Sequence, residues 1–223
     1  MSEEVPWSDQ TRRELRESIS QFLLGQLRLK RNDAEEILDN CCQMFVEEGP
    51  PEEEEEDFEQ FAEAELERIA AELAAEEATW PDETDCDRLD RVESKLRDQG
   101  IMLWQVSPCC DSCTVSELSY RIDEIERRFP GFKDRVRGYA FFIDQTMPEM
   151  LAEKTELTVY LGYGWISTDQ AEVAPDLYEA NALGIAQEVC RCLQDEGLEP
   201  NWDGSFSRKI GVSLNWRRRE TIE

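Results

Sequence analysis

Apolar residues in the first third of the chain recur every three or four positions, which is the spacing of one face of an α-helix. Two segments show this spacing, residues 9–30 and residues 33–48. Their apolar stripes consist of Leu15, Ile19, Phe22 and Leu23 in the first segment and Ala34, Ile37, Leu38, Cys41 and Phe45 in the second. The Gly-Pro-Pro sequence at residues 49–51 breaks the second pattern, so two short amphipathic helices are predicted.

A third helix is predicted after this break, and it is strongly acidic. Residues 52–80 carry a single apolar stripe among runs of glutamate, which is the pattern of a helix with one buried face. The stripe consists of Phe58, Phe61, Ala62, Leu66, Ile69 and Leu73. Together the three helices predict a helical, acidic N-terminal region that covers residues 1–78.

From Thr84 onward, helical patterns alternate with apolar runs of strand length. Thr84 is a predicted helix N-cap and Gly100 is the predicted end of the same helix. The apolar residues 101–107 then predict a buried strand. Thr114 and Glu117 are three residues apart and precede another helical stripe, so they predict a capping box that starts the next helix.

The rest of the chain predicts two strands at residues 138–144 and 157–164 with a short helix between them, and then a longer helix at residues 175–197. This longer helix is expected to bury Leu177, Ala180, Leu183, Cys190 and Leu193. Asp203-Gly204 predicts the turn of a terminal hairpin. Residues 79–223 are therefore predicted to form an α/β or α+β core domain, with a small mixed sheet and flanking helices.

Charge is the most unusual property of the composition. The chain has 24 Lys and Arg against 52 Asp and Glu, a formal net charge of −28. More than half of the excess lies in residues 47–83, where 17 residues are acidic and Arg68 alone is basic. This balance repels phosphate backbones and anionic membrane surfaces and favours a basic protein partner, so neither nucleic-acid nor membrane binding is expected. The residues predicted to bind that partner are Glu52, Glu53, Glu54, Glu55, Glu56 and Asp57.

The absence of histidine excludes several enzyme classes. Ser-His-Asp and Cys-His nucleophilic systems and the common zinc hydrolase sites all require an imidazole, and the chain has none. No run approaches the roughly 20 apolar residues of a membrane span, and the first ten residues lack the features of a signal peptide. We therefore expect a cytoplasmic protein with free thiols, and a binding protein rather than an enzyme.

Three of the eight cysteines lie close together in the sequence SPCCDSC, residues 107–113. Cys110 and Cys113 have the Cys-x-x-Cys spacing of metal and redox motifs. Cys86 lies in the first turn of the helix that Thr84 caps, and it could approach them if the two helix ends are adjacent. One hypothesis is therefore a four-thiolate zinc site made by Cys86, Cys109, Cys110 and Cys113.

Two other interpretations of the cysteine segment stay open. The Cys-x-x-Cys pair could carry thiol chemistry, although Asp111 disfavours a second negative charge beside it. Alternatively, the cysteines are small buried residues of a strand-to-helix turn. Cys41 and Cys190 fall on apolar helix stripes and are interpreted as packing residues, whereas Cys42 and Cys192 lie off those stripes.

Six segments follow one another across residues 79–219: TWPDETDCDRLD (79–90), CCDSC (109–113), GYAFFIDQT (138–146), LTVYLGYG (157–164), NWDG (201–204) and LNWRRR (214–219). In these segments the chain resembles a bacterial domain family of unknown function. The resemblance implies a single domain of that family in which Cys86 and the cysteines of CCDSC are family-like positions, and it implies no activity. Thr114 and Ile143 stand where the resemblance leads us to expect a glycine and a histidine.

These observations predict a non-enzymatic, cytoplasmic interaction protein of inhibitor, immunity or regulatory type, whose acidic surface binds a basic protein. The alternative is a metal- or thiol-dependent protein centred on the four cysteines. No cofactor is expected in the first case, and zinc is the expected ion in the second. The sequence indicates neither the identity of the partner nor the oligomeric state.

Overall fold

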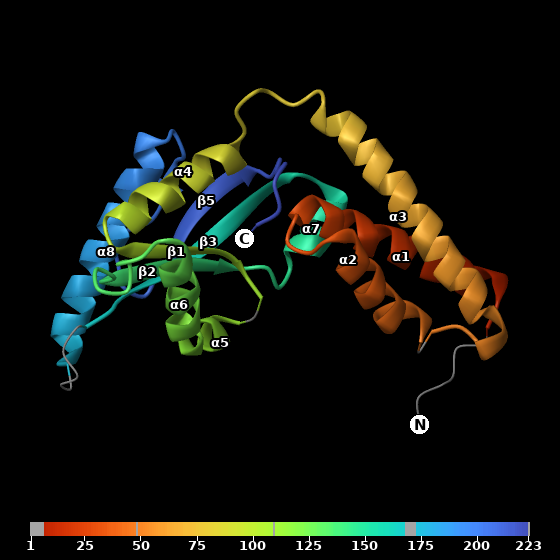
Figure 1. Ribbon diagram of the computed structural model, residues 1–223, viewed down its shortest axis with the longest axis horizontal. Coiled ribbons are helices and arrows are strands. Elements are labelled where there is room, and N and C mark those ends of the chain that lie inside the picture. Colours follow the sequence, from red (N-terminus) through yellow and green to blue (C-terminus); the bar gives the residue numbers. More distant parts are fainter. Residues whose placement is uncertain (1–6, 48, 109, 168–172, 223) are drawn as a thin grey trace. The chain divides into compact units, whose positions relative to one another are not determined.

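The computed structural model describes residues 7–47, 49–108, 110–167 and 173–222 (Figure 1). The chain forms two compact units, which we call the helical unit and the sheet unit. The helical unit consists of residues 1–82, 146–155 and 216–223, and the sheet unit consists of residues 83–145 and 156–215. Each unit is therefore built from segments that are distant in the sequence.

The helical unit contains the three helices that the N-terminal pattern predicts. Ser8 and Asp33 cap the first two, each accepting a hydrogen bond from a backbone N–H in the first turn. The second helix ends earlier than the pattern predicts and continues as one turn of π-helix. The elements are α1 (Asp9–Leu29), α2 (Ala34–Cys41), the π-helix η1 (Cys42–Val46), the 3-10 helix η2 (Glu52–Glu54), α3 (Glu55–Glu77) and α7 (Met147–Glu153).

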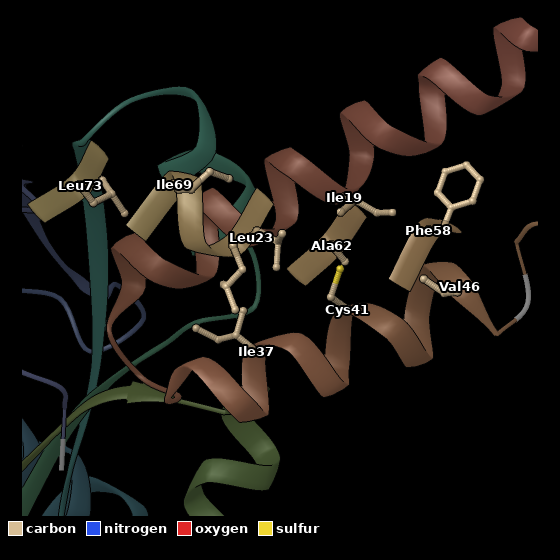
Figure 2. Packing of buried hydrophobic residues seen from close by; sticks show 10 residues of the cluster. Ile19, Leu23, Ile37, Cys41, Val46, Phe58, Ala62, Ile69 and Leu73 are labelled. Carbon is tan, nitrogen blue, oxygen red and sulfur yellow. The ribbon is translucent and has the colours of Figure 1, made fainter. Parts of the chain in front are cut away.

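A single hydrophobic core holds α1, α2, η1 and α3 together. Figure 2 shows side chains from these elements pointing toward one another. The buried residues of this core are Ile19, Leu23, Ile37, Cys41, Val46, Phe58, Ala62, Leu66, Ile69 and Leu73. The predicted stripe of α3 is confirmed except at Phe61, which is half-buried at the edge of the core.

Two later segments of the chain complete the helical unit. Helix α7 packs against α1 at Gly25, where the backbones of the two helices come into close approach. The C-terminal segment also reaches α1: the indole Nε1 of buried Trp216 donates to the carbonyl oxygen of Arg28 at 3.0 Å. The backbone N–H of Ile222 donates to the carbonyl oxygen of Lys30 at 2.7 Å. These bonds satisfy carbonyl groups at the end of α1 that have no partner inside the helix.

The sheet unit is a five-stranded mixed sheet with helices on both faces, so the predicted fold class is confirmed. Strands β1 and β2 are parallel, and the remaining neighbours are antiparallel, in the order β1-β2-β3-β5-β4. Its elements are α4 (Asp85–Asp98), β1 (Ile101–Ser107), α5 (Asp111–Ser116), α6 (Leu118–Arg128), β2 (Gly138–Ile143), β3 (Glu156–Trp165), α8 (Pro175–Asp195), β4 (Pro200–Asn201) and β5 (Ile210–Asn215).

The two faces of the sheet are covered by different helices (Figure 1). Helix α6 places Ile122 and Ile125 against alternate residues of β1 and β2, among them Met102 and Phe141. Helices α4 and α8 cover the opposite face. Alternate side chains of a strand point to opposite faces, so Met102 and Trp104 of β1 both lie on the α6 side of the sheet.

The predicted capping box at Thr114 and Glu117 is wrong. Thr114 lies inside α5, and its hydroxyl is hydrogen-bonded to the hydroxyl of Ser107 at 2.6 Å and donates to the carbonyl oxygen of Cys110 at 3.1 Å. Glu117 is the N-cap of α6 and makes no side-chain cap. The helical region therefore begins at Asp111, with Cys110 as its N-cap. The Thr114 hydroxyl cannot cap a helix, because it is hydrogen-bonded to Ser107 on β1.

The predicted buried face of α8 is also wrong in part. Leu177 is 53% exposed and Cys190 is half-buried, whereas Cys192 is buried. The residues that α8 buries are Ala182, Ile185, Ala186, Val189, Cys192 and Leu193. Two apolar stripes are available on this helix, and the one rich in small and β-branched residues packs on the sheet.

Candidate functional site

Glu54, in the acidic segment, is a structural residue of the helical unit. Its carboxylate accepts hydrogen bonds from Arg12, at 2.7 Å from Nε, and from Trp7 Nε1 at 2.8 Å. The bonds from Arg12 and then from Trp7 lower the pKa of Glu54 to about 2. The pair joins α1 to the start of α3, so Glu54 has an internal partner.

The other predicted binding residues are not held in this way. Glu55 is half-buried, and Glu52, Glu53, Glu56 and Asp57 are exposed. The exposed set continues along α3, and we call it the acidic ridge: Glu52, Glu53, Glu56, Asp57, Glu59, Glu63 and Glu67. No carboxylate of the ridge forms an ion pair within the described part of the chain.

Other acidic residues of α3 do have cationic partners. Glu65 accepts from Arg68 at 2.7 Å and from the hydroxyl of Ser20 at 2.7 Å. Glu77 pairs with Lys30 at 2.8 Å. The hydrogen bond from Arg68 is the largest cause of the lowered pKa of Glu65. Helix α3 therefore carries two kinds of carboxylate, one kind bound to cations of its own unit and the other facing solvent.

Repulsion within the ridge works against the helix that carries it. Glu59, Glu63 and Glu67 follow one another at intervals of four residues, and Glu56 lies three residues before Glu59. Side chains at these intervals are neighbours on a helix, and like charges there cost about 0.2–0.5 kcal/mol per pair. The ridge is thus a concentration of negative charge that folding of the chain does not require.

The cysteine segment lies at the end of β1 in the sheet unit. Cys110 is exposed, Cys113 is half-buried, and their Sγ atoms are 3.5 Å apart. Cys86 is buried in the first turn of α4, and Cys109 lies outside the described residues. The structure therefore brings together two of the four cysteines that the sequence singles out.

Among the residues that the structure describes, no three of Cys, Asp and Glu are gathered in a group that could hold a metal ion. Because Cys109 is outside those residues, the four-thiolate zinc site stays a prediction. The predicted conflict between Asp111 and a thiolate is reduced, because Asp111 accepts a hydrogen bond from Lys209 Nζ at 2.7 Å. This ion pair balances the carboxylate that lies between the two cysteines in the sequence.

One polar cluster of the sheet unit was not predicted. Gln105 is a buried amide on β1, and its Nε2 donates to Asp90 Oδ1 at 2.9 Å and to Glu93 Oε2 at 2.7 Å. Burial raises the pKa of Glu93 above its usual range. The signal in the sequence is a glutamine within an otherwise apolar strand, preceded by two acidic residues at helical spacing.

The raised pKa of Glu93 predicts a pH dependence of stability. Protonated Glu93 favours the folded state, so its contribution is present below its unfolded-state pKa and is lost as the pH rises through the folded-state pKa. We expect Glu93→Gln, which can still accept from Gln105, to raise the free energy of unfolding at neutral pH and to flatten its dependence on pH. Urea unfolding between about pH 4 and pH 7 tests the prediction, with Glu199→Gln as the exposed control in the same unit. Equal effects of the two substitutions would contradict the prediction.

Taken together, these features define an α+β protein with an acidic helical unit and a sheet unit that carries a close pair of thiols. The chain belongs to the family described as Domain of unknown function (DUF6891), whose family model matches residues 12–220. The match includes most of α1 and all of α2 and α3, which lie before the segments that carry the resemblance in the sequence. Searches of curated proteins and of solved structures gave no significant match.

Within the described ranges, no helix is both long enough and apolar enough to cross a membrane. The longest helices are α1, α3 and α8. In each of them, charged or polar residues lie between the apolar residues of the buried face. Their apolar faces are used in the cores of the two units.

Proposed function

We propose that the protein is a non-enzymatic binding protein of the cytoplasm, and that its acidic ridge docks a basic protein. The observation that carries the proposal is the set of seven exposed ridge carboxylates, none of which has a cationic partner among the described residues. A basic partner would supply those cations.

Some carboxylates of α3 are paired with cations of the helical unit, whereas those of the ridge have no such pairing among the described residues. This difference supports a role of the ridge in binding a partner rather than in solubility alone. A solvated face needs only a modest excess of charge, mixed with cations that lower the repulsion. Here the available cations of the unit, such as Arg12, Lys30 and Arg68, are engaged by other carboxylates. The repulsion that remains on the ridge is relieved only by charges from outside the chain.

The geometry of the ridge describes the kind of partner. From Glu56 to Glu67 the ridge follows one side of α3 for about 17 Å, at about 1.5 Å per residue. A helix or extended segment with several Lys or Arg side chains along such a length would match it. Association would be steered by charge, fast at low ionic strength and strongly weakened by salt.

Neutralising the ridge tests the proposal directly. The ridge variant replaces its six glutamates by glutamine and Asp57 by asparagine. The control variant makes the same change at seven exposed acidic residues of the sheet unit: Asp98, Asp134, Glu156, Asp176, Glu179, Asp195 and Glu199. Both variants gain the same net charge, so a difference between them reports the position of the charge.

The expected result is that a basic protein from the native host is retained by the wild type and by the control variant and is lost with the ridge variant. Its release by about 0.5 M salt is also expected, because screening is strong at that concentration. Equal loss with both variants would show a nonspecific effect of net charge and would overturn the proposal. Retention by the ridge variant would overturn it as well.

A stability measurement separates loss of binding from loss of folding. We expect the ridge variant to stay within about 1 kcal/mol of the wild type at low salt. Removal of like-charge pairs, about 0.2–0.5 kcal/mol each, is offset by loss of the first-turn carboxylates Glu56 and Asp57, which stabilise the N-terminus of α3 by about 0.3–1 kcal/mol each. Urea unfolding at two salt concentrations measures the difference, which should shrink as salt screens both effects, and a ridge variant destabilised by several kcal/mol would contradict the prediction.

A further inference from the structure

The sulfur atoms of Cys110 and Cys113 are close enough to make a bond after a small movement. They are 3.5 Å apart, and the bond length of a disulfide is about 2.05 Å. Cys110 is the N-cap of α5 with an extended backbone, and Cys113 lies in the first turn of that helix. Rotation of the two side chains can bring the sulfurs together while α5 keeps its backbone.

Accessibility distinguishes Cys110 from the other described cysteines. Among the seven cysteines that the structure describes, Cys110 alone is exposed. Burial raises the pKa of Cys41 to about 12 and that of Cys190 to about 11, which keeps both thiols protonated. Burial also raises the pKa of Cys42 and of Cys192. Because the thiolate is the reactive form, these four thiols are poor nucleophiles.

The turn that carries the pair is fixed to the sheet. The hydroxyls of Ser107 and Thr114 are hydrogen-bonded at 2.6 Å, which joins the end of β1 to α5. Thr114 also donates to the carbonyl oxygen of Cys110 at 3.1 Å. Asp111, the first residue of α5, pairs with Lys209 next to β5. These contacts fix the turn that carries exposed Cys110 and half-buried Cys113.

We propose that Cys110 and Cys113 are a thiol–disulfide exchange site that forms a reversible intramolecular disulfide with a small disulfide of the glutathione class as oxidant. Cys110 is the attacking thiol because it is exposed, and Cys113 is the resolving thiol because it is half-buried next to it. The site lies in the sheet unit and does not depend on the binding role of the acidic ridge in the helical unit.

The exchange has two steps. The Cys110 thiolate attacks one sulfur of glutathione disulfide, so a mixed disulfide forms and one glutathione leaves as its thiolate. The Cys113 thiolate then attacks the Cys110 sulfur, which forms the Cys110–Cys113 bond and releases the second glutathione. Two electrons pass from the protein to glutathione disulfide, and the two thiol protons go to the released glutathione molecules.

Mass spectrometry of the full chain in glutathione buffers tests the proposal. The native protein is incubated with glutathione disulfide, alkylated and digested with trypsin. Cys109, Cys110 and Cys113 fall in one tryptic peptide, since no Lys or Arg lies between Arg97 and Arg121. We expect this peptide to lose two hydrogen atoms on oxidation, to resist alkylation at Cys110 and Cys113, and to recover both thiols with excess reduced glutathione.

Single substitutions identify the roles. Cys113→Ser should accumulate a mixed disulfide with glutathione at Cys110, and Cys110→Ser should take up glutathione in this peptide about tenfold more slowly. Cys109→Ser should form the disulfide as the wild type does. Thermal unfolding of each variant checks that it is folded.

Three outcomes would overturn the proposal. The first is a fully alkylated peptide after incubation with excess glutathione disulfide. The second is a disulfide that includes Cys109 in the wild-type protein. The third is an unchanged rate of glutathione uptake in a folded Cys110→Ser variant.

Discussion

Replacing Gly25 by alanine should destabilise the helical unit by about 1–3 kcal/mol, the usual cost of overpacking a core. A Cβ at this position would overlap the carbonyl group of Pro148 in α7. The clashing atoms are backbone, so relief requires the whole of α7 to move away from α1. Glycine inside a helix costs about 1 kcal/mol relative to alanine, and its presence in α1 is explained by this close approach.

Gly184 provides the matched control, because it also lies inside a long helix but has nothing within 4 Å of an added Cβ. Gly184→Ala should stabilise the protein by about 0.5–1 kcal/mol. Urea unfolding of both variants measures the difference, and hydrogen exchange of α7 locates it. If Gly25→Ala also stabilised the protein, α1 and α7 would not be in contact at this position.

The sequence predicts the helices and strands well because each follows a simple periodic pattern. The stripe of α3 includes every residue that this helix buries, whereas the stripe of α1 includes Ile19 and Leu23 but not Leu29. Thr84 forms the predicted N-cap with a capping box to Asp87. Contacts between distant segments have no such pattern. The sequence predicts α7 as a short helix between two strands, but its packing on Gly25 depends on the path of the chain in three dimensions.

The two errors in the sheet unit have the same origin. Thr114 and Glu117 satisfy the local rule for a capping box, yet the hydroxyl of Thr114 binds Ser107 on β1. The two stripes of α8 are both apolar, and the shape of the sheet surface selects the one that contains Cys192. In each case a tertiary contact decides between local alternatives.

The candidate sites were predictable to different degrees. The spacing of Cys110 and Cys113 predicts that they are close, since residues three apart are neighbours in a helical turn. The composition of residues 47–83 predicts an acidic surface, but it cannot show that Glu54 is turned inward to Arg12. No sequence motif predicts the contact between Glu93 and Gln105. Carboxylates are abundant in this chain, and the burial of these two residues depends on the packing of α4 on β1.

Phe58→Ala is expected to have the largest effect on stability, a loss of about 3–5 kcal/mol. Phe58 is 1% exposed and lies in the core where α1, η1 and α3 meet (Figure 2). Its ring also packs edge-on against Trp7, with 5.9 Å between ring centroids, and Arg16 lies over it at 5.6 Å. Removing the ring leaves a cavity in this core, which adds to the lost burial of the ring itself.

Phe61 is the control for this substitution, because it lies one turn along α3 and is also covered by the guanidinium of Arg16, at 5.2 Å. Phe61 is only half-buried, so Phe61→Ala should cost about 1 kcal/mol. Hydrogen exchange read separately for α3 and for β3 should show the loss of protection in the helical unit. Equal costs for the two substitutions would mean that α3 does not pack through the Phe58 face. Asp57 and Glu59 of the acidic ridge flank Phe58 in the sequence, so Phe58→Ala should also weaken binding of a basic partner by loosening the first turns of α3.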